Sequence, residues 1–310
     1  INYIYICSAG HSGSTLLDLL LGTNSRIESL GETNHLPKNI SLNMPCSCGF
    51  EVRSCPAWKE IIYLISIKTG TNLLDNPYSF DLGYVMPAVI RDKIHKSIRY
   101  KIKRKLFNGL WYASLRYSNV YSPLISKHLS RTLDNNFLLY DTVRKVRNVD
   151  VVTDSQKHYL KAVSIYKKHP ENVRLIFLTR DGRAVFHSNR KRSETRRASV
   201  HARKHHYQRA LPLFDRHIPK EHYLPVKYED LATNPSSVLK DICRFVNVEF
   251  EPGMLDYSNK EHHILNGNPM RFNASTKVRL DTSWQTGLTE QDHLYFEKHA
   301  GSLNRKLGYN

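Results

Sequence analysis

The stretch INYIYICSAGHSGSTLLDLLLG, residues 1–22, decides the fold of this chain. Its apolar run at 1–7 predicts a β-strand, the small residues at 8–13 predict a loop, and the segment from Ser14 to about Leu21 predicts an α-helix. Such a loop presents backbone N–H groups to an anion, and the dipole of the following helix adds to the attraction. The predicted anion ligands are the backbone and hydroxyl groups of Gly10, His11, Ser12, Gly13, Ser14 and Thr15.

This loop lacks the lysine of the nucleotide-hydrolysing enzymes. Their motif, GxxxxGK[ST], has a lysine directly after its second glycine. Here Ser14 follows Gly13, and Ser8 stands in the place of the first glycine. The loop therefore predicts a phosphate-like ligand without a triphosphate clamp.

Strands and helices alternate along the second half of the chain. The sequence predicts a strand that ends at Asp154, a strand over 173–179 and a strand near 223–228, each followed by a helix. Their apolar runs do not alternate with polar residues, as expected for strands covered on both faces. We expect an α/β, P-loop-like, three-layer fold with a central parallel sheet flanked by helices and with ligands at the carboxyl ends of the strands. Residues 78–131 predict a helical, substrate-side insertion within a single domain spanning 1–310, because no linker flanks them.

The charge of the chain predicts an anionic partner. The formal net charge is +18, and basic residues are concentrated at 91–105 and 180–209. A nucleic acid, an acidic lipid surface and a polyanionic small molecule would each fit, and a solvated helix face also explains a charge run. No apolar run approaches the roughly 20 residues that span a bilayer, and we expect no secretory leader. The prediction is a cytoplasmic protein without a membrane span.

Three of the five cysteines lie in MPCSCGFEVRSCPAW, residues 44–58. Cys46, Cys48 and Cys55 could hold zinc with a nearby histidine such as His35, although structural zinc sites usually show paired CxxC spacing. A local disulfide is a second possibility and an ordinary turn a third. We favour the turn and expect no metal.

A second anion site is predicted in LIFLTRDGRAVFHSNRKR, residues 175–192. Arg180 closes a strand, and Ser188 and Arg192 are expected one turn apart on the following helix. A guanidinium binds phosphate oxygens through two parallel hydrogen bonds. Two anion sites on one sheet, neither of them a triphosphate clamp, indicate a nucleotide phosphorylated at both ends of its ribose. Exposed arginines on a solvated helix are the alternative.

Several motifs, in the family's order, resemble those of the sulfotransferases that use 3′-phosphoadenosine 5′-phosphosulfate (PAPS), above all the bacterial-type and tyrosylprotein branches. SAGHSGSTLL resembles the family's 5′-phosphosulfate loop, and the segment at 175–192 resembles its 3′-phosphate segment. LGETNHLP resembles the stretch with the catalytic glutamate of the tyrosylprotein branch, and VTDSQK resembles an Asp-Ser-Ser-Lys motif. VKYEDLATNP and GNPMRF…DTSW are similar to recurrent later segments. The resemblance spans about 3–290, apart from the insertion.

The resemblance implies transfer of a sulfuryl group from PAPS to an acceptor hydroxyl or amine by in-line displacement, with 3′-phosphoadenosine 5′-phosphate (PAP) as product and no metal. It implies Glu32 as the base that removes the acceptor proton, and His11 and Lys157 as the groups that neutralise the leaving oxygen. The alternatives are that Glu32 only caps a helix or pairs with a cation, and that Lys157 takes over the role of a protonated His11 or the activity differs. The family usually has lysine or arginine at the position of His11. The donor is expected to contact the loop at 10–15, the second anion site and three further residues, namely Tyr228, Arg271 and Lys277.

The acceptor is left open by the sequence. We expect a small natural product or a saccharide, and a peptidyl tyrosine is the alternative that the LGETNHLP motif suggests. Three other classes of protein compete with a sulfotransferase. A P-loop kinase or NTPase would need a lysine after Gly13 and magnesium, a nucleic-acid-binding protein would use the basic stretch at 91–105, and an inactive relative would bind sulfated glycans. We regard nucleic acid as an unlikely partner.

Overall fold

A parallel β-sheet lies at the centre of the molecule. The computed structural model describes residues 1–83, 98–192, 195–272 and 278–310. The described strands are β1 (Tyr3–Ser8), β2 (Ile27–Ser29), β3 (Val151–Lys157), β4 (Val173–Thr179) and β5 (Tyr223–Lys227). They are arranged in the order β2-β3-β1-β4-β5, and each neighbouring pair is parallel. This arrangement confirms the predicted α/β fold class.

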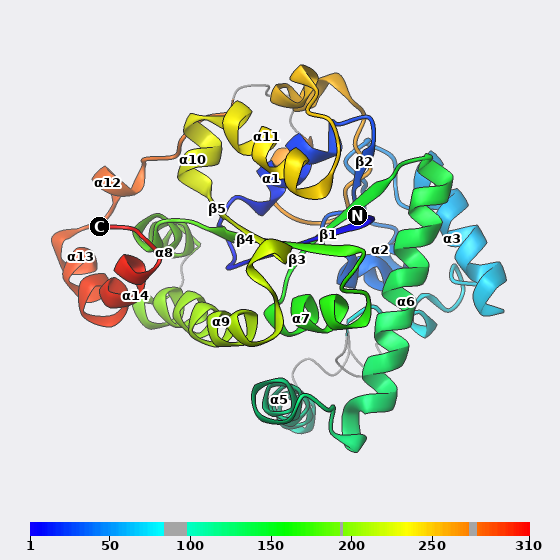
Figure 1. The fold of residues 1–310 in the computed structure, drawn as a ribbon, viewed down its shortest axis with the longest axis horizontal. Helices are drawn as coiled ribbons and strands as arrows, with labels where there is room; N and C mark the ends of the chain where they lie inside the picture. Colours follow the sequence, from blue (N-terminus) through cyan, green and yellow to red (C-terminus); the bar gives the residue numbers. More distant parts are fainter. Residues whose placement is uncertain (84–97, 193–194, 273–277) are drawn as a thin grey trace.

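Helices connect the strands and cover the sheet (Figure 1). In the described part of the chain they are α1 (Ser14–Gly22), α2 (Leu36–Leu42), α3 (Pro56–Thr69), α5 (Ile98–Ala113), α6 (Pro123–Arg147), α7 (Tyr159–Lys168), α8 (Gly182–Arg190), α9 (Arg196–His217), α10 (Tyr228–Thr233), α11 (Pro235–Val246), α12 (Trp284–Gly287), α13 (Glu290–Phe296) and α14 (Ser302–Lys306). The start of α1 at Ser14 and the bounds of β4 are those that the sequence predicts.

Successive side chains of β1 pack into two apolar cores, one on each face of the sheet. Tyr3, Tyr5 and Cys7 belong to the core that α6, α7 and α9 share, whereas Ile4 and Ile6 belong to the core that α1 and α11 share. Figure 1 shows α7 and α9 on one side of the sheet and α1, α10 and α11 on the other. Both faces are therefore covered, which explains why the strands lack polar alternation.

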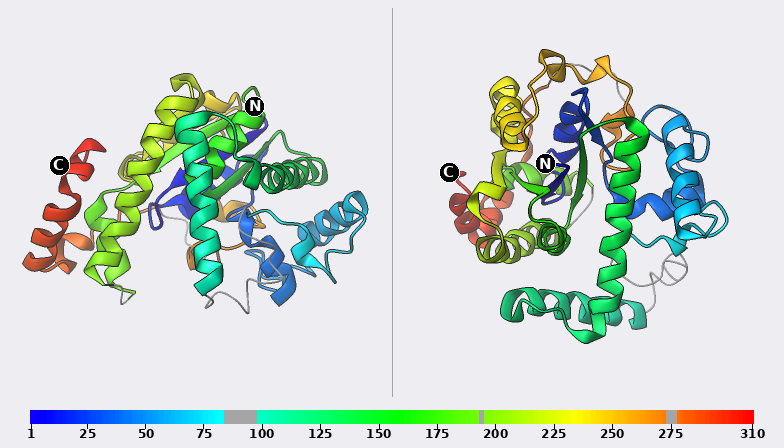
Figure 2. Two further views of the ribbon diagram at one scale, coloured as in Figure 1. Left: turned by 90° about the horizontal axis from the view of Figure 1, so that it is seen from below. Right: turned by 45° about the vertical axis from the view of Figure 1, so that its right-hand side comes forward.

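Helix α6 joins the predicted insertion to the sheet. The sequence analysis ends the insertion near Arg131, but α6 runs without a break from Pro123 to Arg147. The second half of α6 contacts the sheet, where the Tyr140 hydroxyl donates to the carboxylate of Asp154. Figures 1 and 2 show α5 at the other end of α6, away from the sheet. The second half of α6 therefore anchors the helical insertion to the core of the domain.

One strand boundary differs from the prediction, and one strand was not predicted. Strand β3 continues three residues beyond Asp154, and β2 lies in a polar stretch for which no strand was predicted. In β2, Glu28 forms an ion pair with Arg147, and the Ser29 hydroxyl donates to the main-chain oxygen of Asp18 at 2.6 Å. These polar side chains find their partners inside the fold, so no apolar run marks the strand.

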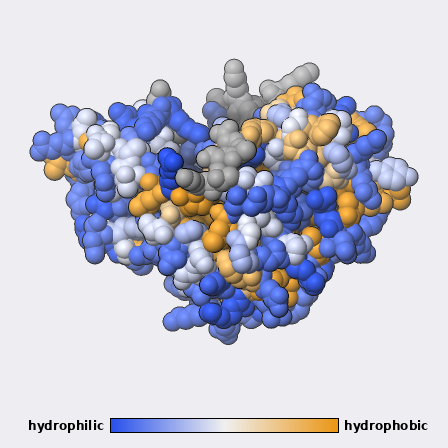
Figure 3. Space-filling model, turned by 90° about the horizontal axis from the view of Figure 1, so that it is seen from above, coloured by the Kyte–Doolittle hydropathy of each residue, from blue (hydrophilic) through white to orange (hydrophobic). Residues whose placement is uncertain are grey.

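The surface is mainly hydrophilic on the face that Figure 3 shows, with hydrophobic residues in scattered patches. Such a mixture is normal for a protein surface in contact with water. No helix in the described part of the chain is both long enough and apolar enough to cross a membrane.

Candidate active site

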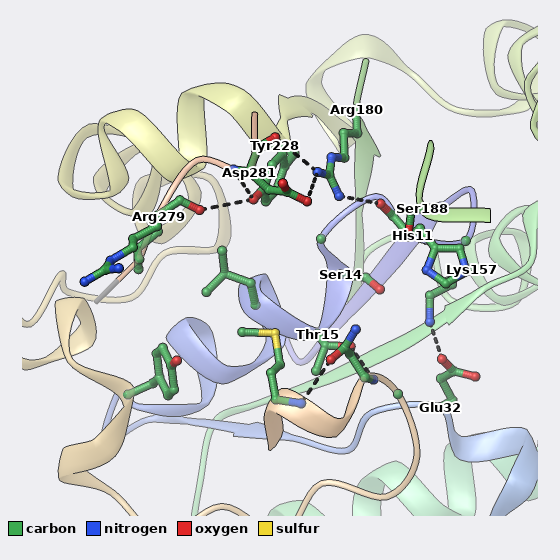
Figure 4. Close-up of a pocket in the computed structure, with 18 of the residues that line it drawn as sticks. His11, Ser14, Thr15, Glu32, Lys157, Arg180, Ser188, Tyr228, Arg279 and Asp281 are labelled. Carbon is green, nitrogen blue, oxygen red and sulfur yellow. Dashed lines mark hydrogen bonds and ion pairs between the residues drawn. The ribbon is translucent and has the colours of Figure 1, made fainter. Parts of the chain in front are cut away.

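The carboxyl ends of the five described strands open onto one cavity of about 690 Å³ (Figure 4). Parallel sheets bind ligands at this edge, and sites for small molecules usually measure about 300–1,000 Å³. The strand ends supply Glu32 after β2, Lys157 in β3, the loop at 10–15 after β1, Arg180 after β4 and Tyr228 after β5. The sheet therefore brings together residues from most of the length of the chain.

The loop between β1 and α1 follows a tight backbone path. His11 has φ 63° and Gly13 has φ 88°, both in the left-handed region. Gly13 directly precedes α1, and Ser14, the first residue of the helix, lines the cavity. Ser12 is fully buried, and its hydroxyl lies 3.4 Å from that of Tyr207. The predicted loop thus forms part of the cavity, except that the Ser12 side chain faces the core.

Replacing Gly13 with alanine is expected to destabilise the fold. A left-handed φ costs a residue with a side chain about 1–2 kcal/mol, and a Cβ at this position would lie 2.4 Å from Cδ2 of Tyr228. Since each kcal/mol shifts the melting temperature of a domain of this size by about 2–4 °C, we expect a clear decrease in a thermal unfolding experiment. Gly10→Ala is the matched control, because a Cβ there has no neighbour within 4 Å. Equal melting temperatures for the two variants would contradict this role of Gly13.

Arg180 is 7% exposed and is held by three neighbours. Its Nη1 donates to the main-chain oxygen of His11 at 3.1 Å, and its Nη2 donates to Oδ2 of Asp281 at 3.0 Å. The guanidinium carbon lies 4.3 Å from the centre of the Tyr228 ring. The buried Nε has no hydrogen-bond partner among the described residues. Arg180 therefore links the first loop to the C-terminal segment at the wall of the cavity.

Ser188 and Arg192 line the same cavity as Arg180. Ser188 lies in α8, whereas Arg192 follows the end of that helix and does not lie within it as predicted. The Arg192 amide still donates to the main-chain oxygen of Asn189 at 3.0 Å, so the turn continues the path of the helix. The residues of the second predicted anion site and the first loop thus meet in one cavity.

Glu32 and Lys157 form an ion pair in the cavity (Figure 4). Lys157 has a left-handed φ of 73°, and the register between β1 and β3 shifts between Tyr5 and Cys7, where the strands approach this residue. Such irregularities redirect a side chain at the end of a strand. His35, which the sequence analysis considered as a zinc ligand, instead has its Nε2 3.6 Å from Oε2 of Glu32.

His11 lines the cavity as a neutral side chain at neutral pH. Burial lowers the pKa of its imidazole, and the positive charges of Arg192, Lys157 and Arg180 lower it further. Burial and like charges both disfavour the protonated form of histidine. The positive charge beside the first loop therefore comes from Lys157 and the neighbouring arginines, not from His11.

Two charged residues of the cavity wall are missing from the sequence prediction. Burial alone would raise the pKa of Asp281, but hydrogen bonds from Ser283 and the pairing with Arg180 lower it to about 2. The main-chain oxygen of Arg279 accepts a hydrogen bond of 3.2 Å from the Tyr228 hydroxyl. The motif GNPMRF…DTSW contains Asp281, but its pairing with a residue 101 positions away leaves no local signal.

Of the two basic residues that were expected to contact the donor, one is described and lies outside the lining of the cavity. Arg271 does not line it, and its guanidinium donates to the main-chain oxygen of Gly267 at 3.2 Å and lies over the ring of Phe272. Lys277 lies outside the described residues.

Comparisons with known proteins point to one family. A family model described as "Sulfotransferase family" matches residues 98–252, half of the chain. The solved structure of a sulfotransferase domain from the curacin biosynthetic pathway is similar with a TM-score of 0.53 and 18% identity, covering 100% of this chain and 98% of that one. This similarity supports the fold.

Two other solved structures are more distant. The sulfotransferase domain of the olefin synthase from Synechococcus PCC 7002 has a TM-score of 0.47 and 17% identity, covering 100% of this chain and 95% of that one. A sulfotransferase from Mycobacterium avium has a TM-score of 0.47 and 14% identity, with coverages of 97% and 76%. No curated protein matches the chain in sequence.

Proposed function

Because the chain belongs to the sulfotransferase family, we propose that it transfers a sulfuryl group from PAPS to a hydroxyl or amine of an acceptor, which is a small natural product or a saccharide. The observation that supports this most strongly is that two groups of anion-binding residues share one cavity. One is the loop at 10–15, and the other consists of Arg180, Ser188 and Arg192. A nucleotide that is phosphorylated at both ends of its ribose requires two such groups.

The charge of the cavity suits this donor. Four cationic side chains and two anionic ones line it, which gives a net charge of +2 with His11 neutral: Lys157, Arg180, Arg192 and Arg279 against Glu32 and Asp281. The loop at 10–15 would hold the sulfate-bearing 5′ end. Arg180 would bind the 3′-phosphate, with Ser188 and Arg192 beside it. Gly13 and Arg180 both line the cavity in which these oxyanions would bind.

The donor supplies an activated sulfuryl group, and the protein supplies position, a base and a positive charge. Glu32 takes the proton of the attacking hydroxyl or amine, since it is a carboxylate at the cavity wall. Lys157 neutralises the oxygen that leaves, because a fixed cation stabilises charge that develops during transfer. His11 contributes its backbone and a neutral imidazole.

Specific residues argue against the two competing classes, a kinase or NTPase and a nucleic-acid-binding protein. Ser14 replaces the lysine that a kinase or NTPase requires. The basic stretch at 91–105 lies partly outside the described residues, and a groove lined by Lys101, Arg104 and Lys105 is separate from the cavity.

A peptidyl tyrosine is an alternative acceptor. None of the five cysteines forms a disulfide, which fits the cytoplasmic location that we include in the proposal.

Calorimetric titration with PAP in buffer without added magnesium tests the donor, and a screen of acceptors with PAPS tests the transfer. We expect one PAP to bind per chain without added metal, and PAPS to be consumed with at least one acceptor in the screen. Binding of ATP only with magnesium, and not of PAP, would support the kinase class and overturn the proposal. Salt-dependent binding of DNA or RNA without binding of PAP would overturn it in favour of the nucleic-acid class.

A further inference from the structure

Three cysteines and one histidine converge outside the cavity. The potential ligand atoms of Cys46, Cys48, Cys55 and His263 all lie within 4.8 Å of one another. Cys46, Cys55 and His263 are buried, and Cys48 is partly exposed. The cysteines belong to the loop before α3, whereas His263 comes from the C-terminal part of the chain. Two segments about 200 residues apart thus meet at this cluster.

We propose that this cluster is a structural zinc site with three thiolate ligands and one imidazole ligand. Sγ of Cys48 lies 3.6 Å from Sγ of Cys55, which in turn lies 3.3 Å from Nδ1 of His263. Sγ of Cys46 lies 4.0 Å from the same nitrogen. Ligands at about 2.0–2.3 Å from a tetrahedral zinc ion are about 3.3–3.8 Å apart. The cluster is therefore close to the size that zinc requires.

The number and kind of ligands indicate a structural ion. Four protein ligands complete the coordination of zinc and leave no position for a substrate, which is typical of structural sites. Thiolate sulfur and imidazole nitrogen favour zinc over magnesium or calcium. None of the four residues lines the cavity. The proposed ion therefore takes no part in the transfer, which stays free of metal.

The local backbone presents the first two sulfur atoms to the same point. The amide of Cys46 donates to the main-chain oxygen of Phe50 at 2.8 Å, and the amide of Gly49 donates back to Cys46 at 3.0 Å. Gly49 has φ 89°, a conformation that favours glycine. This tight turn, with glycine directly after Cys48, allows ligands only two positions apart to face one another despite the lack of CxxC spacing.

The histidine is held with its Nδ1 toward the sulfur atoms. Its main-chain oxygen accepts a hydrogen bond of 2.8 Å from Nε1 of Trp58, a residue of α3. Its other ring nitrogen, Nε2, lies 3.7 Å from Oε2 of Glu261. A carboxylate beside the second nitrogen is common for histidines that bind metal, because it orients the ring. The sequence analysis considered His35 for this position, and the structure places His263 there.

A disulfide or an ordinary turn accounts for less of the arrangement than a zinc site does. A disulfide between Cys48 and Cys55 needs its sulfur atoms about 2.05 Å apart, and it would leave Cys46 and His263 without a role. An ordinary turn gives no reason for three thiols to surround one buried imidazole.

The proposed zinc ion would fix one wall of the cavity. Two residues after His263, Leu265 accepts a hydrogen bond of 3.1 Å from the amide of Glu32 and donates one of 3.3 Å to Leu30. Farther along, the amide of Asn268 donates to the hydroxyl of Thr15 at 3.1 Å. The ion would thus hold the segment that supports Glu32. Zinc binding itself does not rest on the proposed function, whereas this consequence for Glu32 does.

The experiment measures metal in the purified, reduced protein by plasma mass spectrometry. We expect about one zinc per chain in the wild type and less than about one-tenth in Cys55→Ala and His263→Gln. The matched controls are Cys243→Ala and His35→Gln, which should keep the full amount. Cobalt added to zinc-depleted wild-type protein should give the absorption of a tetrahedral thiolate complex, a readout that does not depend on the folding of any variant.

Three outcomes would overturn the proposal. The first is wild-type protein that contains no zinc and gives no cobalt spectrum after reduction. The second is a Cys48–Cys55 disulfide in protein isolated with zinc in the medium. The third is a loss of zinc in the controls Cys243→Ala and His35→Gln that equals the loss in Cys55→Ala and His263→Gln. Loss of zinc that leaves the rate of sulfate transfer unchanged would keep the metal site and remove its effect on Glu32, so the two parts are tested separately.

Discussion

Replacing Arg180 with alanine is expected to abolish the binding of PAP in a calorimetric titration. Arg180 is almost fully buried, and it joins the loop after β1 to Asp281. Here the charge pair is that of Arg180 with the 3′-phosphate of PAP. Truncating one partner of a buried charge pair costs about 2–5 kcal/mol of binding free energy, which corresponds to a loss of affinity of about 30- to 4,000-fold. The alanine variant also leaves the Asp281 carboxylate without its cation, which adds repulsion toward an anionic ligand.

The controls for this experiment separate binding from folding. Arg244→Ala removes an arginine that is exposed on α11 and pairs with Asp241 on the same helix, so PAP binding should be unchanged. Arg180→Lys should give an intermediate loss, since an ammonium group keeps the charge but loses the paired hydrogen bonds of guanidinium. If Arg180→Ala melts at the temperature of the wild type and still binds PAP with the wild-type affinity, the assignment of Arg180 to the donor is wrong.

Replacing Glu32 with glutamine is expected to remove turnover and leave PAP binding intact. A positioned base contributes about 10²–10⁴-fold to a rate, and the amide of glutamine cannot take the acceptor proton. The substitution keeps the shape of the side chain but ends its ion pair with Lys157. Because that lysine then faces the donor without a counter-charge, the affinity for PAP should stay the same or increase.

The measurement is the rate of sulfate transfer at saturating PAPS, combined with the dissociation constant of PAP. Glu60→Gln, an exposed position on α3, is the matched control and should behave as the wild type. Undiminished turnover in Glu32→Gln would exclude Glu32 as the base. A parallel loss of PAP binding would instead make Glu32 part of the donor site.

Local signals in the sequence predicted the central part of the fold well. The first strand and its helix follow from one apolar run, one glycine-containing loop and one leucine-rich segment, all within residues 1–22. The bounds of β4 follow in the same way from a run of aliphatic residues. These elements depend on short-range patterns, and a parallel sheet then places their carboxyl ends together.

The features that the sequence did not reveal depend on partners far along the chain. Strand β2 is short and polar, so its sequence carries no strand pattern. In the fold, its Glu28 pairs with Arg147, which lies far along the chain. The pairing of Arg180 with Asp281 and the meeting of His263 with the three cysteines join segments that no spacing rule connects. The lowered pKa of His11 also follows from burial and from cations that only the folded chain brings around it.

The order of the strands separates the residues proposed to bind the donor from the residue proposed to act on the acceptor. On the proposed function, the groups that grip the sulfate source follow β1 and β4 in the middle of the sheet, whereas Glu32 follows β2 at its margin. Enzymes of this kind can therefore acquire new acceptors through changes in the segments at the edge of the sheet. The residues that bind the common donor, in the middle of the sheet, can stay the same. Divergence among relatives should accordingly concentrate around the margin that carries Glu32.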